Sequence, residues 1–129
     1  MSVSILVVDD EPDVALLFRQ RFRREVRDGI YVMHFANSGE MALERLGSGI
    51  EPTLIVILSD INMPGMDGLQ LLEAVKQRFP GIPVMMVTAY GDEERRHRAS
   101  TLGAVEFITK PVDFDALKAH LRQLPGAAD

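Results

Sequence analysis

The sequence of 129 residues lacks several features that would define a function class at once. It contains no cysteine, which excludes both a disulfide framework and thiol chemistry. No apolar run approaches the ~20 residues of a membrane span, and no cationic segment of the kind found in signal peptides begins the chain. The net charge of −5 disfavours binding to nucleic acid through bulk charge. We therefore expect a cytoplasmic protein with no membrane association and no direct nucleic-acid binding.

Length and composition are those of one folded domain. Hydrophobic residues make up 47% of the chain and charged residues 26%, an ordinary balance for a globular protein. At this length, folding buries roughly two-thirds of the surface of the unfolded chain, so one hydrophobic core suffices without disulfides or structural metals. We expect a single domain over residues 1–125 and a loose tail over residues 126–129.

Strand and helix patterns alternate along the chain. Apolar runs predict strands at 3–8, 30–36, 54–59, 84–88 and 104–109. Between and after them, helical patterns extend over 12–28, 38–46, 69–79, 92–102 and 114–124. This alternation predicts an α/β fold, a doubly wound parallel sheet with helices on both faces.

The polarity of each run predicts its place in the sheet. The runs containing His34 and Glu106 are expected at the edges, because the central strands of such a sheet are apolar on both faces. The runs 4–8, 54–58 and 84–87 are read as apolar on both faces and are expected in the centre. These assignments match a five-stranded sheet with the order 2-1-3-4-5.

Polar residues stand where four of the predicted strands end. Asp9 and Asp10 follow the first strand, Asp60 the third, Thr88 the fourth and Lys110 the fifth. The carboxyl ends of parallel strands gather at one edge of the sheet, where ligands bind. Three carboxylates brought together repel one another unless a cation joins them. The pattern indicates a divalent-metal site beside a nucleophilic aspartate, with Thr88 and Lys110 placed to receive a phosphoryl group.

These residues lie in four motifs that together resemble the receiver domain of two-component response regulators. The motifs are Val7-Val8-Asp9-Asp10-Glu11-Pro12, Asp60-Ile61-Asn62-Met63-Pro64-Gly65-Met66-Asp67-Gly68, Val87-Thr88-Ala89 and Lys110-Pro111. The resemblance covers nearly the whole chain. It implies a phosphorylation-activated switch that takes a phosphoryl group from a histidine kinase or a histidine phosphotransfer protein. Its own phosphorylation and dephosphorylation would be its only chemistry, so it would not otherwise be an enzyme.

The resemblance also implies a role for each residue of the site. Asp60 would be the phosphoacceptor, and Thr88 and Lys110 would contact the phosphoryl oxygens. The cofactor would be Mg²⁺, with ligands from Asp9, Asp10, Asp60 and the Asn62 carbonyl. The Lys110-Pro111 bond is cis in the family.

Further residues of the resemblance concern switching and water access. Thr88 and Phe107 would form the switch. Asn62 and Tyr90 would flank the path of the water that attacks the acyl phosphate, with the bulky Tyr90 slowing phosphoryl loss. The segment 92–102 offers few core residues, mainly Ala99 and Leu102, so a weakly docked helix is expected there. We expect a homodimer contact or an output partner on the face formed by residues 92–124.

Two alternatives stay open from the residues alone. A phosphohydrolase of the haloacid-dehalogenase type uses the same residue types, but it generally has a second acid where this chain has Asn62, and a cap domain for which there is no room. A receiver fold could also act only as a binding scaffold, although intact Asp60, Thr88 and Lys110 argue against that. Two features depart from the family pattern: Ser59 precedes the phosphoacceptor, and the segment from Pro52 to Asp60 is slightly long.

Overall fold

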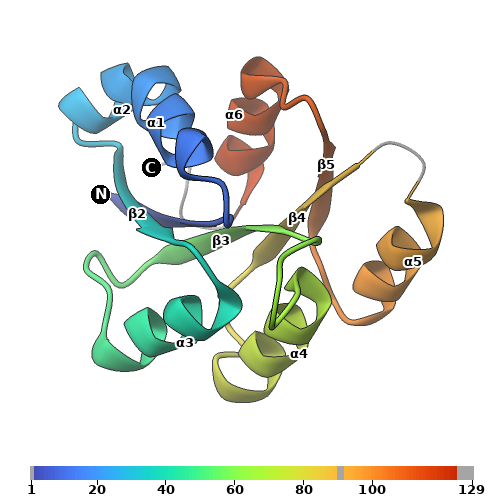
Figure 1. The fold of residues 1–129 in the computed structure, drawn as a ribbon. Helices are drawn as coiled ribbons and strands as arrows, with labels where there is room; N and C mark the ends of the chain where they lie inside the picture. Colours follow the sequence, from blue (N-terminus) through green and yellow to red (C-terminus); the bar gives the residue numbers. More distant parts are fainter. Residues whose placement is uncertain (1, 90–91, 125–129) are drawn as a thin grey trace.

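The computed structural model describes residues 2–89 and 92–124 of the chain. Strands and helices alternate along it (Figure 1). In chain order they are β1 (Val3–Val8), α1 (Pro12–Arg21), α2 (Arg23–Arg27), β2 (Tyr31–Ala36), α3 (Gly39–Ser48), β3 (Ile55–Asp60), α4 (Gly68–Arg78), β4 (Val84–Thr88), α5 (Glu93–Thr101), β5 (Glu106–Thr109) and α6 (Phe114–Gln123). No helix in these two ranges has the length and apolar character needed to cross a bilayer.

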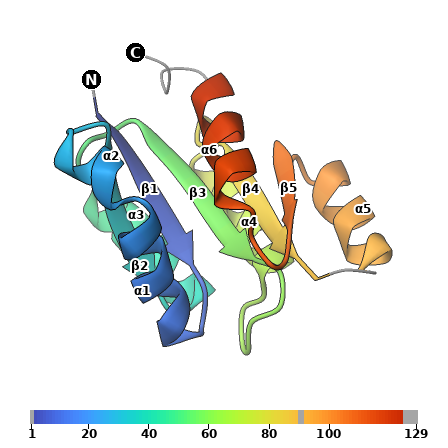
Figure 2. The same ribbon diagram turned by 90° about the horizontal axis from the view of Figure 1, so that it is seen from above.

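The strands form one parallel sheet with the predicted order, β2-β1-β3-β4-β5. Helices α1, α2 and α6 lie on one face, and α3, α4 and α5 lie on the other (Figure 1). In the register of the sheet, Val8 pairs with Ser59, Asp60 with Val87 and Thr88 with Thr109. The carboxyl ends of these strands therefore reach one edge together, and the β3–α4 loop extends beyond it (Figure 2).

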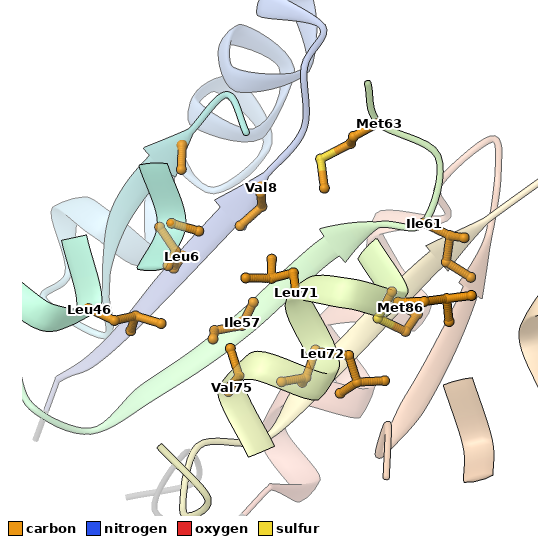
Figure 3. Packing of buried hydrophobic residues seen from close by; sticks show 14 of the residues in the cluster. Leu6, Val8, Leu46, Ile57, Ile61, Met63, Leu71, Leu72, Val75 and Met86 are labelled. Carbon is orange, nitrogen blue, oxygen red and sulfur yellow. The ribbon is translucent and has the colours of Figure 1, made fainter. Parts of the chain in front are cut away.

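Each face of the sheet has its own hydrophobic core. Along β1, Leu6 and Val8 join the core beneath α3 and α4, whereas Ile5 and Val7 join the core beneath α1 and α6. Figure 3 shows the first of these cores, where Leu71, Leu72 and Val75 of α4 lie over Ile57. Side chains alternate across a strand, so a central strand serves both cores through apolar residues on both of its faces. The buried exceptions Ser4 and Ser59 donate hydrogen bonds to the Pro52 and Asp60 carbonyls.

The edge strands carry the polar residues, as the sequence predicts. His34 in β2 and Glu106 in β5 are both partly exposed. His34 lies opposite Leu6 of β1, and Glu106 lies opposite Met85 of β4. Polar groups are tolerated there because one side of an edge strand faces water.

The predicted first helix over 12–28 is interrupted, and this is a correction. Phe22 leaves helical geometry, with φ −102° and ψ 10°, and separates α1 from α2. Its ring is fully buried against Phe18, Tyr31 and Phe114, and this packing fixes the chain where the helix bends. Val26, four residues after Phe22, is 42% exposed, so the apolar face of this segment ends at Phe22.

The fifth strand is shorter than predicted, beginning at Glu106 rather than at residue 104. The Ala104 N–H donates to the Ala99 carbonyl at 3.0 Å, so this residue closes the end of α5 instead of joining the sheet. Gly103, at φ +101°, makes the turn that allows this closure. The third strand is also shifted by one residue, to Ile55–Asp60.

Candidate functional site

Three carboxylates meet at the carboxyl edge of the sheet. Asp9 and Asp10 follow β1, and Asp60 is the last residue of β3. One oxygen from each lies within 4.8 Å of the others. Asp60 is 5% exposed, Asp9 is partly buried and Asp10 is exposed. The structure thus brings together the three acids that the sequence singles out.

Lys110 supplies a positive charge to this cluster. Its Nζ lies 3.0 Å from Asp60 Oδ2 and 3.9 Å from Asp9 Oδ2. Its backbone N–H donates to the Thr88 carbonyl at 2.8 Å, and the Lys110-Pro111 bond is cis, as the resemblance implies. Burial lowers the pKa of the Lys110 ammonium, but the hydrogen bond and charge of Asp60, with Asp9 and Glu11, outweigh it, so the pKa lies above its ordinary value. Lys110 is therefore a permanent cation of the site.

Backbone amides hold two of the carboxylates in place. The Asn62 N–H donates to Asp60 Oδ1 at 3.2 Å, and the Glu11 N–H donates to Asp9 Oδ1 at 2.9 Å. Burial raises the pKa of the Asp9 carboxyl, and the charge of Asp60 adds to this, against the opposing effects of the Glu11 N–H and Lys110. The cluster thus holds crowded negative charge that a further cation would relieve.

The donor set fits Mg²⁺. Three carboxylates lie within coordinating reach of one ion, and Asn62 lies two residues after Asp60 on the adjacent loop. Hard oxygen donors are those that Mg²⁺ takes in proteins, and it usually keeps several waters. The exposure of Asp10 leaves such waters room.

The proposed switch residues lie on neighbouring strands. Thr88 ends β4 with only 2% of its surface exposed, at the same edge as Asp60. Phe107 of β5 pairs with Met86 of β4 and packs against the core beneath α4. The guanidinium of Arg96 lies over the Phe107 ring, 5.0 Å from its centroid. Tyr90, predicted to flank the water path, falls outside the described residues.

An open cavity of about 460 Å³ leads to the site between α1 and the β5–α6 connection. Asp9, Asp60 and Lys110 are among its lining residues, whereas most of its wall is apolar. Leu17 also lines it and is 39% exposed, and the neighbouring Leu16 is 67% exposed. The phosphoacceptor candidate is therefore reachable from outside although its own side chain is buried.

Sequence reasoning gave no role to two residues at the site. Gly68 starts α4 behind Asp60, where a Cβ atom would lie 2.3 Å from the Asp60 carbonyl oxygen and 2.7 Å from Ile61 Cα. The sequence marks it only as the last residue of the motif that begins at Asp60, just after the helix cap Asp67. Arg95 of α5 donates a hydrogen bond from its guanidinium to the Asn62 side-chain oxygen. No local pattern marks Arg95, because it stands in a run of charged residues.

Comparison with known proteins gives matches over most of the chain. The response regulator receiver domain family matches residues 5–122. The transcriptional regulatory protein ZraR of Escherichia coli K12 is 35% identical over 122 residues, which is 95% of this chain and 26% of ZraR. The transcriptional regulator NtrC of the same organism is 40% identical over 111 residues, 86% of this chain and 22% of NtrC. The chain therefore spans about a quarter of the length of these curated relatives.

One of the solved structures that the chain matches contains Mg²⁺ and BeF. The response regulator protein TrrA of Thermotoga maritima, in complex with Mg²⁺ and BeF, matches with a TM-score of 0.76 and 31% identity over 92% of this chain and 96% of TrrA. The family match also decides against the phosphohydrolase alternative, because receiver domains are signalling switches and not enzymes of that kind. The chain belongs to the response regulator receiver domains, the phosphorylation-activated switches of two-component signalling.

Proposed function

We propose that Asp60 is the phosphoacceptor of this receiver domain and that its donor is a phosphohistidine on a histidine kinase or histidine phosphotransfer protein. One observation carries the proposal: the Asp60 carboxylate ends β3 with the Lys110 Nζ at 3.0 Å and with oxygens of the acid pair, Asp9 and Asp10, within 4.8 Å. A nucleophile placed between a fixed cation and a cation-binding cluster suits an incoming group that carries spread negative charge.

The reaction is a displacement at phosphorus. An Asp60 oxygen attacks the phosphorus in line, forming an acyl phosphate, while the bond from phosphorus to the histidine nitrogen breaks. The electron pair of that bond stays on the nitrogen, which takes up a proton. The Lys110 ammonium and the Thr88 hydroxyl are the proposed partners of the phosphoryl oxygens. Fixed donors of this kind stabilise charge as it develops, without first having to reorganise.

Asp9, Asp10, Asp60 and the Asn62 carbonyl would hold the Mg²⁺. When bound, the ion neutralises repulsion between these carboxylates and the arriving phosphoryl group. The acid pair would hold the ion at the edge of the sheet, where the Glu11 N–H fixes the partly buried Asp9 carboxylate. Asn62 and Tyr90 stay our prediction for the residues that flank the attacking water.

The cavity between α1 and the β5–α6 connection is the proposed entrance for the donor. Asp60 lines it, Leu17 lines it at 39% exposure, and Leu16, next in the chain, adds exposed apolar surface. An imidazole ring carried on a partner helix needs such an opening, since Asp60 itself is buried. The cytoplasmic location expected from the sequence is part of this proposal.

The output is proposed to use the face of residues 92–124, through a homodimer or a separate partner. Among the described residues of α5, only Ala99 is buried, so this helix shifts at little energetic cost. Phe107 lies on the strand between α5 and α6, where its movement with Thr88 would alter that face. Light scattering with and without a phosphoryl mimic tests the homodimer.

Phosphorylation by a small donor tests the proposed function. The protein is incubated with acetyl phosphate in Mg²⁺ or in EDTA, and its intact mass is measured. We expect a gain of one phosphoryl group in Mg²⁺ and almost none in EDTA. Equal labelling in both, or labelling in neither, would contradict the proposal, and the latter would favour a binding scaffold.

A further inference from the structure

We infer that Arg95 is a positioning residue that couples the charge state of Asp60 to the position of α5. This inference rests on the proposed function and goes beyond it, because the switch proposed above runs through Thr88 and Phe107. Arg95 approaches the site from a different element and by a different contact, the hydrogen bond to the Asn62 side chain.

Helix α5 has little apolar attachment to the rest of the domain. Of its nine residues only Ala99 is buried, and Leu102 just beyond it is partly buried. Two arginines provide further attachment: Arg96 lies over the Phe107 ring, and Arg95 bonds to Asn62. Because its core contacts are few, the position of α5 depends strongly on these polar contacts.

Two hydrogen bonds, one to the side chain of Asn62 and one from its backbone, link α5 to the phosphoacceptor. The Arg95 guanidinium donates to the Asn62 side-chain oxygen, and the Asn62 backbone N–H donates to Asp60 Oδ1 at 3.2 Å. Arg95 lies in the first turn of α5, so its movement carries the start of the helix with it. The Arg95 charge is thus linked through one residue, Asn62, to the Asp60 carboxylate that would be phosphorylated.

Phosphorylation of Asp60 would change the electrostatic attraction that Arg95 feels at Asn62. It adds negative charge beside Asn62 and removes charge from the Asp60 oxygen, which becomes part of an acyl phosphate. A guanidinium pairs more strongly with phosphoryl oxygens than with a neutral amide oxygen, because the pair is charge-assisted and forked. Arg95 is therefore drawn toward Asp60, and the first turn of α5 becomes more firmly held.

Hydrogen exchange of the α5 amides, with and without Mg²⁺ and beryllofluoride, tests the inference. In the unchanged protein we expect exchange in residues 93–101 to slow by about fivefold or more, the lower end of usual coupling between sites. Arg95→Gln keeps a donor for Asn62 but loses the charge, and its response should fall below about twofold. Arg95→Lys keeps the charge and should retain most of the response. Arg98→Ala removes an equal charge from an exposed position of the same helix and should respond as the unchanged protein does.

A simple tether would behave differently. If Arg95→Gln responds as fully as Arg95→Lys, Arg95 only fastens α5, and the inference is wrong. It is also wrong if Arg95→Ala responds like the unchanged protein. Calorimetry of beryllofluoride binding separates this failure from failure of the proposed function. The unchanged protein must bind the mimic. Arg95→Gln and Arg95→Ala must still bind it, with an affinity that falls by no more than the lost coupling of about fivefold, while losing the α5 response.

Discussion

The Lys110 ammonium is shared by two carboxylates, since its Nζ lies 3.0 Å from Asp60 Oδ2 and 3.9 Å from Asp9 Oδ2. The same charge serves two purposes. It offsets part of the negative charge of the acid cluster when no ion is bound, and it is available to a phosphoryl group on Asp60. A metal ion and Lys110 therefore compete for the negative charge of Asp60 and Asp9, while both favour the phosphoryl group.

Replacing Lys110 should separate these two purposes. In Lys110→Met we expect beryllofluoride affinity to fall at least about tenfold, equivalent to about 1.4 kcal/mol, because one partner of the phosphoryl oxygens is lost. Mg²⁺ affinity should rise in the same variant, because the competing cation is gone. Titration calorimetry measures both constants. Parallel losses of both affinities would contradict the competition between Lys110 and the metal.

Removing Asp10 should raise the stability of the metal-free protein and lower its affinity for Mg²⁺. Asp10 is the exposed member of the cluster, so Asp10→Ala removes a like charge without opening a cavity. The unchanged protein should gain about 2.7 kcal/mol of unfolding free energy when Mg²⁺ reaches 100 times its dissociation constant. Urea denaturation with Mg²⁺ or EDTA should show a smaller gain for Asp10→Ala at the same Mg²⁺ concentration. An undiminished gain would show that Asp10 does not hold the ion.

Gly68 should not tolerate even one added carbon. A Cβ atom there would meet backbone atoms of Asp60 and Ile61 at 2.3 and 2.7 Å, so α4 or the end of β3 must move. Gly68→Ala should lower the unfolding free energy by about 1–3 kcal/mol, as overpacking does, and weaken beryllofluoride binding. The matched control is Gly81→Ala, where a Cβ meets nothing within 4 Å and the change should stay within about 0.5 kcal/mol. Equal effects at the two glycines would refute the close contact.

The fold could be predicted from the sequence because the signals that define its strands lie within short segments of the chain. Apolar runs, with His34 and Glu106 marking the edges, suffice for the strand order, and the strand ends then place Asp60 beside Lys110. The break at Phe22 could not be read in this way. A phenylalanine four residues after Phe18 continues a helical face, and only packing against Tyr31 and Phe114 shows that the helix bends there.

Contacts that depend on distance in space were equally out of reach. Arg95 is one of several arginines on its helix, and the partner of a long side chain depends on which loop passes near it. The tight fit of Gly68 depends on how closely α4 approaches β3. The sequence shows which residues end strands, but not how near other elements come to them.

Acid should weaken the fold partly through His34. Burial lowers the pKa of this imidazole below 6.5, helped by the charge of Arg45 and opposed by a backbone hydrogen bond with Glu51, and its Nε2 is buried without a hydrogen-bond partner. Between the lowered pKa and 6.5 the unfolded chain binds more protons, so stability falls as the pH drops through this window. Urea denaturation at pH 7.5 and 5.5 should show that the unfolding free energy falls less for His34→Gln than for the unchanged protein. An identical loss would show that His34 does not contribute.

The central claim is that Asp60 carries the phosphoryl group, and locating the label tests it most directly. The protein is labelled with acetyl phosphate and Mg²⁺, the acyl phosphate is trapped by borohydride reduction, and the modified residue is identified by peptide mass spectrometry. We expect modification at Asp60 alone, none in Asp60→Asn, and full modification in the control Asp115→Asn, whose exposed side chain lies on α6. Persistent labelling of Asp60→Asn at another residue, or modification of the unchanged protein elsewhere than Asp60, would contradict the account.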